Sequence, residues 1–193
     1  MPTGSSPREV SPPRDFRIRR DLSPGRYPLL VVFPGLDRLP GFRRLLTLKG
    51  APPDIAEDAC VEVVKDDVWM YVAPWELPPM RRRRGWKPVV APKTDCIVVG
   101  MNHLSQSPPM VLYMDVLHEF CHILQRREGR DLWEPGVGYV DRPTEVEAYQ
   151  FVVDEARERG ASEEFLREYL KVDWVTPAEH QRLLKNLGVP PGS

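Results

Sequence analysis

Two histidines and a glutamate stand close together in the stretch His118 to His122 of this 193-residue chain. On a helix, residues four apart lie on nearly the same side and one turn apart, so both imidazoles can reach one ion. Glu119, next to them, is free to act on a water bound to that ion. Two imidazoles and one further side chain leave a position open for water, which is the catalytic arrangement of zinc. The HExxH pattern therefore predicts one Zn²⁺ site and metal-assisted hydrolysis.

The residues around this motif indicate a helix. Ser107 suits the N-cap, Pro108 and Pro109 suit the first turn, and Gly129 suits a left-handed C-cap. Apolar side chains recur on two sides between these ends, so we expect a mostly buried helix. A polar stripe remains, and it would need partners in the interior unless it is solvated in an open cleft. The stripe consists of Asp115, His118, Glu119, His122 and Arg126.

A third ligand is expected from a second helix over 142–159, capped by Asp141 or Thr144. Helical phase separates its two early glutamates, because Glu145 falls on the packed face and Glu147 on the charged face. The packed face comprises Glu145, Ala148, Tyr149, Val152 and Ala156, and the charged face Glu147, Asp154 and Glu158. A carboxylate on the packed face needs a cation, so Glu145 is the candidate ligand. The alternative is an ion pair with Arg126 or Arg142, and Glu147 is expected to be solvated.

The stretch from Ile97 to Phe151 resembles the gluzincin-type zinc peptidases, and within them most closely the small ImmA/IrrE-like group. In that group a short edge strand and an Asn/Leu/Ser-rich turn precede the HExxH helix, and a later helix carries a Glu-x-x-Ala-x-x-Phe pattern. The matching residues are Ile97 to Val99, Asn102 to Ser107, His118 to His122, and Glu145, Ala148 and Phe151. Cys121 departs from the pattern, because the group often has Gly there.

The resemblance implies two histidine ligands, His118 and His122, a general base, Glu119, and a glutamate ligand, Glu145. It covers about a quarter of the chain. A donor for the developing oxyanion is also needed, and four side chains have a suitable chemical type. They are His103, Tyr139, Arg142 and Tyr149, of which Tyr149 lies one helical turn from Glu145. The sequence singles out none of the four.

The composition fits one domain of moderate size with a poorly ordered N-terminal segment. The chain is 41% hydrophobic with a net charge of −1, which gives no global case for nucleic-acid or membrane binding. Residues 1–26, rich in Pro, Ser and Arg, are expected to be poorly ordered or draped on the surface, and 27–193 to form the domain. No leader or membrane-spanning run is visible, so a cytoplasmic protein is expected. Three scattered cysteines fit reduced thiols.

Short runs rich in β-branched or aromatic residues make 27–101 strand-rich, whereas 107–188 reads as helical. The runs are Leu29 to Phe33, Arg43 to Leu48, Cys60 to Val64, Val68 to Val72 and Cys96 to Gly100. Asp66 and Asp67 suggest a hairpin between two of them. Ser162 is expected to cap a helix that reaches Leu170, and Thr176, Pro177 and Glu179 form a capping box. The prediction is an α+β, zincin-like fold, with a small twisted sheet packed on the active-site helix and a helical C-terminal part.

Two functions from different classes follow. The first is a zinc metallopeptidase that cuts a protein or peptide partner, which an edge strand near Ile97 to Met101 would receive by strand addition. The second is a zincin-fold regulatory module that holds metal without turnover. Glu119 favours the first, because a metal scaffold needs no base there. The run Arg81 to Arg84 is the one hint of a nucleic-acid or acidic partner, and such runs usually form solvated loops.

Overall fold

A computed structural model describes residues 10–72 and 95–192, and the run Arg81 to Arg84 lies outside them. Four strands form one mixed sheet, and the C-terminal part is helical, which confirms the α+β class. The strands are β1 (Gly25–Pro28), β2 (Cys60–Val64), β3 (Met70–Val72) and β4 (Cys96–Gly100). The α-helices are α1 (Leu29–Val32), α2 (Pro40–Leu48), α3 (Met101–Gln106), α4 (Pro109–Arg127), α5 (Pro143–Glu158), α6 (Glu163–Tyr169) and α7 (Pro177–Asn186). Short 3₁₀ turns are η1 (Leu36–Arg38), η2 (Pro53–Asp58) and η3 (Tyr139–Asp141).

The strand order in the sheet is β1-β2-β4-β3. β2 and β4 are parallel, and β1 and β3 each pair antiparallel with their neighbour. The predicted hairpin at Asp66 and Asp67 is therefore wrong, because β4 lies between β2 and β3. The predicted edge strand is wrong too: β4 has a partner on both sides, and among the described strands β3 is the edge beside it. All five residues of β4 are buried, as the unbroken apolar run of a central strand requires.

Two of the predicted strands are helices. In α2, Pro40 occupies the first turn, and Phe42, Leu45 and Leu46 are buried at helical spacing. In α1, Leu29 and Val32 are the buried residues, again three apart. Short apolar runs do not distinguish strand from helix by their pattern. In the fold, α1 packs on β1 and β2, whereas α2 packs on α4 and η1.

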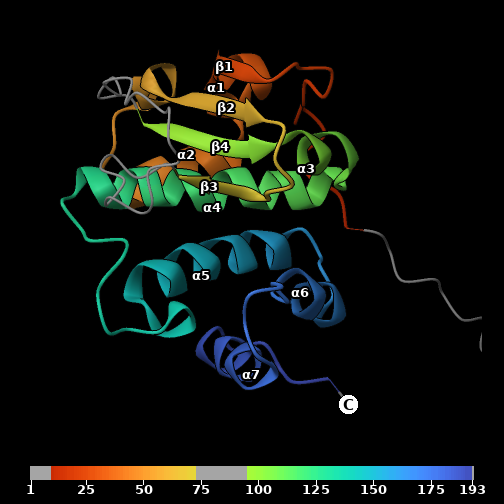
Figure 1. Ribbon diagram of the computed structural model, residues 1–193, viewed down its shortest axis with the longest axis vertical. Helices are drawn as coiled ribbons and strands as arrows, with labels where there is room; N and C mark the ends of the chain where they lie inside the picture. Colours follow the sequence, from red (N-terminus) through yellow and green to blue (C-terminus); the bar gives the residue numbers. More distant parts are fainter. Residues whose placement is uncertain (1–9, 73–94, 193) are drawn as a thin grey trace, which may run out of the picture.

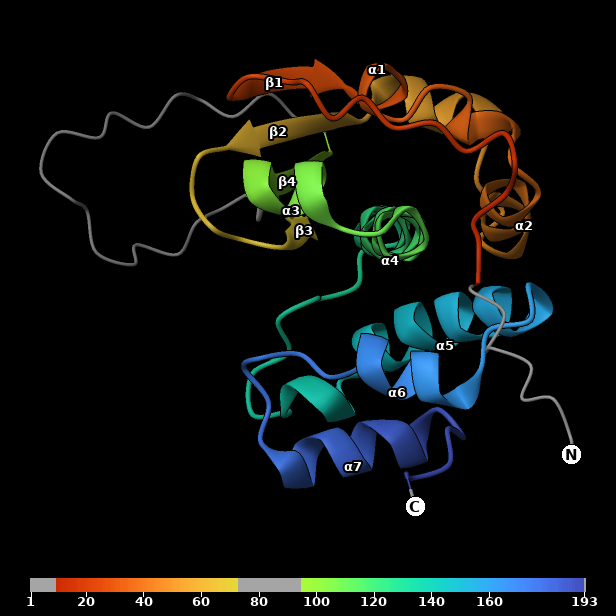
Figure 2. The same ribbon diagram turned by 90° about the vertical axis from the view of Figure 1, so that its right-hand side faces the viewer.

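Helix α4 lies between two layers, with the sheet on one side and α5, α6 and α7 on the other (Figures 1 and 2). It contacts α5, β3 and α2. Every residue from Leu112 to Gln125 is buried in consequence, which confirms the prediction of a mostly buried helix. Its N-cap is Pro108, one residue later than expected, and Gly129 has the predicted left-handed conformation with φ of 80°.

The N-cap of α5 is Arg142, so the predicted caps Asp141 and Thr144 are wrong: Asp141 ends η3, and Thr144 already lies inside the helix. Pro143 occupies the first turn as predicted. The side chain of Ser162 caps α6, also as predicted, by accepting a hydrogen bond from Phe165 N. The capping box of Thr176 and Glu179 at the start of α7 is confirmed. None of the described helices is long and apolar enough to cross a bilayer.

Residues 10–24, within the segment predicted to be loose, contact the rest of the chain where the structure describes them. Phe16 and Leu22 are buried. Arg20 donates hydrogen bonds to the carbonyl oxygens of Leu104, Ser105 and Ser107 at 2.8 to 2.9 Å. These bonds tie this segment to the end of α3, just before α4 begins.

Candidate metal centre

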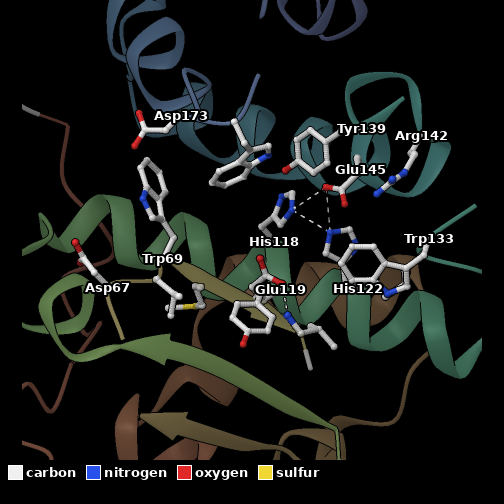
Figure 3. A pocket seen from close by; sticks show the side chains of 16 residues that line it. Asp67, Trp69, His118, Glu119, His122, Trp133, Tyr139, Arg142, Glu145 and Asp173 are labelled. Atoms are coloured by element: carbon white, nitrogen blue, oxygen red, sulfur yellow. Dashed lines mark hydrogen bonds and ion pairs between the residues drawn. The ribbon is translucent and has the colours of Figure 1, made fainter. Parts of the chain in front are cut away.

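His118, His122 and Glu145 come together between α4 and α5, as helical phase predicts (Figure 3). All three are buried, with exposed fractions of 5 to 7%. The two Nε2 atoms are 3.0 Å apart, and Glu145 Oε2 lies 3.4 Å from that of His118 and 3.3 Å from that of His122. Among the described residues these three form the group of ligand atoms that could hold a metal ion.

Gln125 fixes the tautomer of His122. Its Nε2 donates to Thr144 O at 2.9 Å and to Glu147 Oε2 at 3.0 Å, so the amide orientation is determined by two acceptors. Gln125 Oε1 is thus left to accept, and it lies 2.7 Å from His122 Nδ1. The proton of a neutral His122 therefore sits on Nδ1, and its Nε2 presents a lone pair to the centre of the group.

The arrangement at the centre fits a cation. Glu145 Oε2 is buried and has no hydrogen-bond partner among the described residues, despite its closeness to both imidazoles. Its carboxylate therefore faces the two Nε2 atoms without the geometry of a hydrogen bond to either. A buried carboxylate oxygen of this kind is expensive, and a divalent ion between the three atoms would satisfy it. Two imidazoles and a carboxylate are a donor set that zinc accepts.

The pKa values of His118, His122 and Glu145 are shifted because these side chains are buried and lie close to one another. Burial lowers the pKa of His118. Burial alone would lower the pKa of His122 as well, but its contacts with Glu145 raise that pKa to about 9. For Glu145 burial would raise the pKa, and the two imidazoles outweigh it, so this pKa lies well below the usual carboxyl value. The group thus holds Glu145 as a carboxylate.

Glu119 lies beside the three ligand atoms and on the side of β3. It is 8% exposed, and its Oε2 accepts a hydrogen bond of 2.8 Å from Val72 N on that strand (Figure 3). Burial raises the pKa of Glu119 to about 8. A cation at the neighbouring site would favour its charged form, because opposite charge stabilises a carboxylate.

A cleft of about 660 Å³ opens beside this group. Its floor contains His118, Glu119, His122 and Glu145, and β3 forms one wall. The remaining lining residues come from three loops, η3 and the N-cap of α5. They are Asp67, Val68, Trp69, Leu132, Trp133, Tyr139, Arg142, Asp173 and Trp174.

The four candidate oxyanion donors separate in the structure. Tyr139 and Arg142 line the cleft. The ring of Tyr149 packs on His118, with centroids 4.3 Å apart, and its hydroxyl meets that of Tyr139 at 2.8 Å. His103 is held by Asp115 Oδ2 at 2.7 Å and by Ser107 Oγ at 2.9 Å, and it does not line the cleft.

Sequence reasoning missed several residues near the site. Gln125 carried a signal, since it lies three residues after His122 on the same helix and shares its side. Trp69, Trp133 and Trp174 carried none, because their loops are brought to the cleft only by the fold. Glu147, expected to be solvated, has a side chain that is 38% exposed, and besides its hydrogen bond from Gln125 it pairs with two cations, Lys49 and Arg130.

The group on α4 and α5 is a buried His-His-Glu site, consistent with a zincin-like metal centre. No known protein family, curated protein or solved structure matches the chain.

Proposed function

We propose that this protein is a zinc-dependent metallopeptidase that hydrolyses peptide bonds of a specific protein partner. One observation carries the proposal: the carboxylate of Glu119 stands next to the three converging ligand atoms and lines the same cleft. A site that only stores metal has no need of a buried base facing the space where a substrate would lie. The resemblance of 97–151 to gluzincin-type peptidases supports the same function.

Each residue of the site has a separate role in the proposed reaction. His118, His122 and Glu145 would hold the ion, which when bound supplies a water of lowered pKa and polarises a carbonyl. Val72 N–H occupies Oε2 of Glu119, so Oε1 is left to take the proton of the attacking water and pass it to the leaving amine. Tyr139 and Arg142 border the same space and have donors for the developing oxyanion.

The test combines metal analysis with a proteome-wide cleavage screen on the wild type and two variants. Glu119→Gln keeps the shape of the side chain and removes the base, so we expect bound zinc but at least ~100-fold slower cleavage. Glu145→Ala removes a ligand, so both zinc and cleavage should be lost. Asp154→Asn, on the exposed face of α5, is the matched control and should change neither.

Two results would count against the proposal. Undiminished zinc in the His118→Ala, His122→Ala double variant would exclude the metal centre altogether. Tight zinc binding by a wild type that cleaves nothing would leave the zincin-fold regulatory module as the function.

A further inference from the structure

The cleft extends to both sides of the metal centre, and its two sides differ in charge. In Figure 3, Asp67, Trp69 and Asp173 lie on one side of His118 and Glu119, and Trp133 and Arg142 lie on the other. A chain laid across the centre would therefore meet carboxylates at one end and a guanidinium at the other.

Aromatic rings form a corner on the acidic side. Trp69 and Trp174 meet edge to face, with centroids 5.9 Å apart and an interplanar angle of 80°. Tyr139 meets Trp174 in the same manner at 5.8 Å. The two tryptophans are 36% and 55% exposed although they lie within a concave cleft. Large indole surfaces left open in a cleft indicate a place where a ligand contacts them.

Trp69 is held in position before any ligand arrives. Its indole stacks on His103, with centroids 5.6 Å apart and an interplanar angle of 16°. Its carbonyl oxygen accepts a hydrogen bond of 3.2 Å from Gly100 N. Gly100 permits this approach, because a Cβ at that position would overlap the backbone of Val68. A ring fixed in this way pays little entropy on binding.

Among the described residues, the charged groups on the two sides of the cleft have no partner of opposite charge. Asp67 and Asp173 are exposed, and within the described part of the chain neither forms an ion pair or a side-chain hydrogen bond. Arg142 donates from Nε to Val137 O at 3.3 Å and lies over the ring of Trp133 at 5.7 Å, and no described carboxylate pairs with it. Such groups are available to a ligand.

We infer that the Trp69 side of the cleft binds a lysine or arginine side chain of the substrate; this inference rests on the proposed function. The aliphatic stem of such a side chain would lie on the indole surface, and its cationic end would meet the ring faces and the two carboxylates. Arg142 repels a second cation, so the basic residue occupies the Trp69 side only. The subsite thereby fixes which side of the cut bond carries the basic residue.

The first experiment profiles cleavage of a peptide library by the zinc-loaded wild type. We expect lysine and arginine to be enriched at one position on one side of the cut. In the Asp67→Asn, Asp173→Asn double variant, cleavage of basic peptides relative to neutral ones should fall by about tenfold. Asp173→Arg should instead favour glutamate at that position. Asp66→Asn, a neighbouring carboxylate that does not line the cleft, is the matched control and should keep the full preference.

The second experiment measures binding without turnover. Zinc-loaded Glu119→Gln protein is titrated with a labelled alanine pentapeptide that carries lysine or norleucine at its centre, and anisotropy is followed. We expect tighter binding of the lysine peptide, and the difference should shrink in 1 M NaCl. Cleavage without a basic preference, or equal binding of the two peptides, would overturn the subsite. Preferential binding by a wild type that cuts nothing would instead contradict the proposed function and leave the subsite standing.

Discussion

The two histidines of the centre are positioned by different means. His122 is held by a polar network, in which Gln125 Oε1 meets its Nδ1 and the amide of Gln125 binds the start of α5. His118 has no hydrogen-bond partner at Nδ1 among the described residues and is packed against the ring of Tyr149. We call these the polar half and the aromatic half of the centre. A directional bond fixes both the angle and the tautomer of an imidazole, whereas a packed ring fixes only its place.

The largest effect should follow from removal of either imidazole. His118→Ala and His122→Ala each delete a ligand atom, so zinc affinity should fall by more than the ~10–100-fold typical of outer partners. The measurement is a competition titration against a chromogenic zinc chelator. His180→Ala, which removes a histidine of α7 bonded to Arg167 O, should leave the affinity unchanged. A small loss in either ligand variant would mean that the half concerned does not contribute to the site.

Breaking the polar half should be the next largest effect. Gln125→Leu fills the same space but removes the acceptor of His122 Nδ1, so the ring loses its fixed tautomer and Thr144 O loses a donor. We expect zinc to bind about 10–100-fold more weakly. Gln150→Leu, which removes a half-buried glutamine of α5 bonded to Asp154, controls for the substitution itself. Equal affinities in the two variants would show that the polar half has no directional role.

The aromatic half should tolerate the loss of its hydroxyl. Tyr149→Phe keeps the ring on His118 and removes only the contact with Tyr139. Zinc affinity should stay within about threefold of the wild type, because the expected loss is one hydrogen bond of about 1 kcal/mol that does not touch the ligand. Tyr149→Ala, in contrast, should destabilise the fold by about 3–5 kcal/mol in urea denaturation. A loss of zinc in Tyr149→Phe as large as in Gln125→Leu would remove the distinction between the halves.

The comparison of the two halves also shows which features can be predicted from the sequence. Periodicity over α4 and α5 and the capping box at Thr176 are local signals, and they placed the helices and the buried face of Glu145. The runs at α1 and α2 are too short for a period to be decisive, and both were predicted as strands. The sheet order depends on pairing between β2 and β4, which are distant in the chain, so no local pattern encodes it.

Local spacing also decides which residues of the site can be predicted from the sequence. His118, His122 and Glu119 share one helical turn, so their spacing alone brings them together. The network of Gln125 crosses from α4 to α5, and its further members include Lys49 at the C-terminal end of α2. The tryptophans of the cleft lie on separate loops, and the packing of other elements brings these loops together. Residues that depend on the assembly of separate elements were therefore missed.

Glu147, at the outer end of the polar half, should make a small, pH-dependent contribution to the free energy of unfolding. Burial would raise the pKa of Glu147, but hydrogen bonds from Lys49, Arg130 and Gln125 outweigh it and lower that pKa below the usual carboxyl value. A carboxyl whose pKa is lower in the folded state stabilises the fold above its unfolded pKa, and this contribution is lost as the pH falls through the folded pKa. Because the side chain of Glu147 is 38% exposed, screening limits its contribution to about 1 kcal/mol.

Glu147→Gln should accordingly unfold at lower urea concentration than the wild type at pH 7, and the difference should shrink toward zero in acid, where the wild-type carboxyl is protonated. Metal-free protein is compared throughout, so that release of zinc in acid adds nothing. Glu164→Gln, an exposed glutamate in the first turn of α6, is the control. A difference that persists unchanged in acid would mean that the shape of Glu147, and not its charge, supports Gln125. The polar half would then end at the amide of Gln125, and the pairs with Lys49 and Arg130 would be incidental to the position of His122.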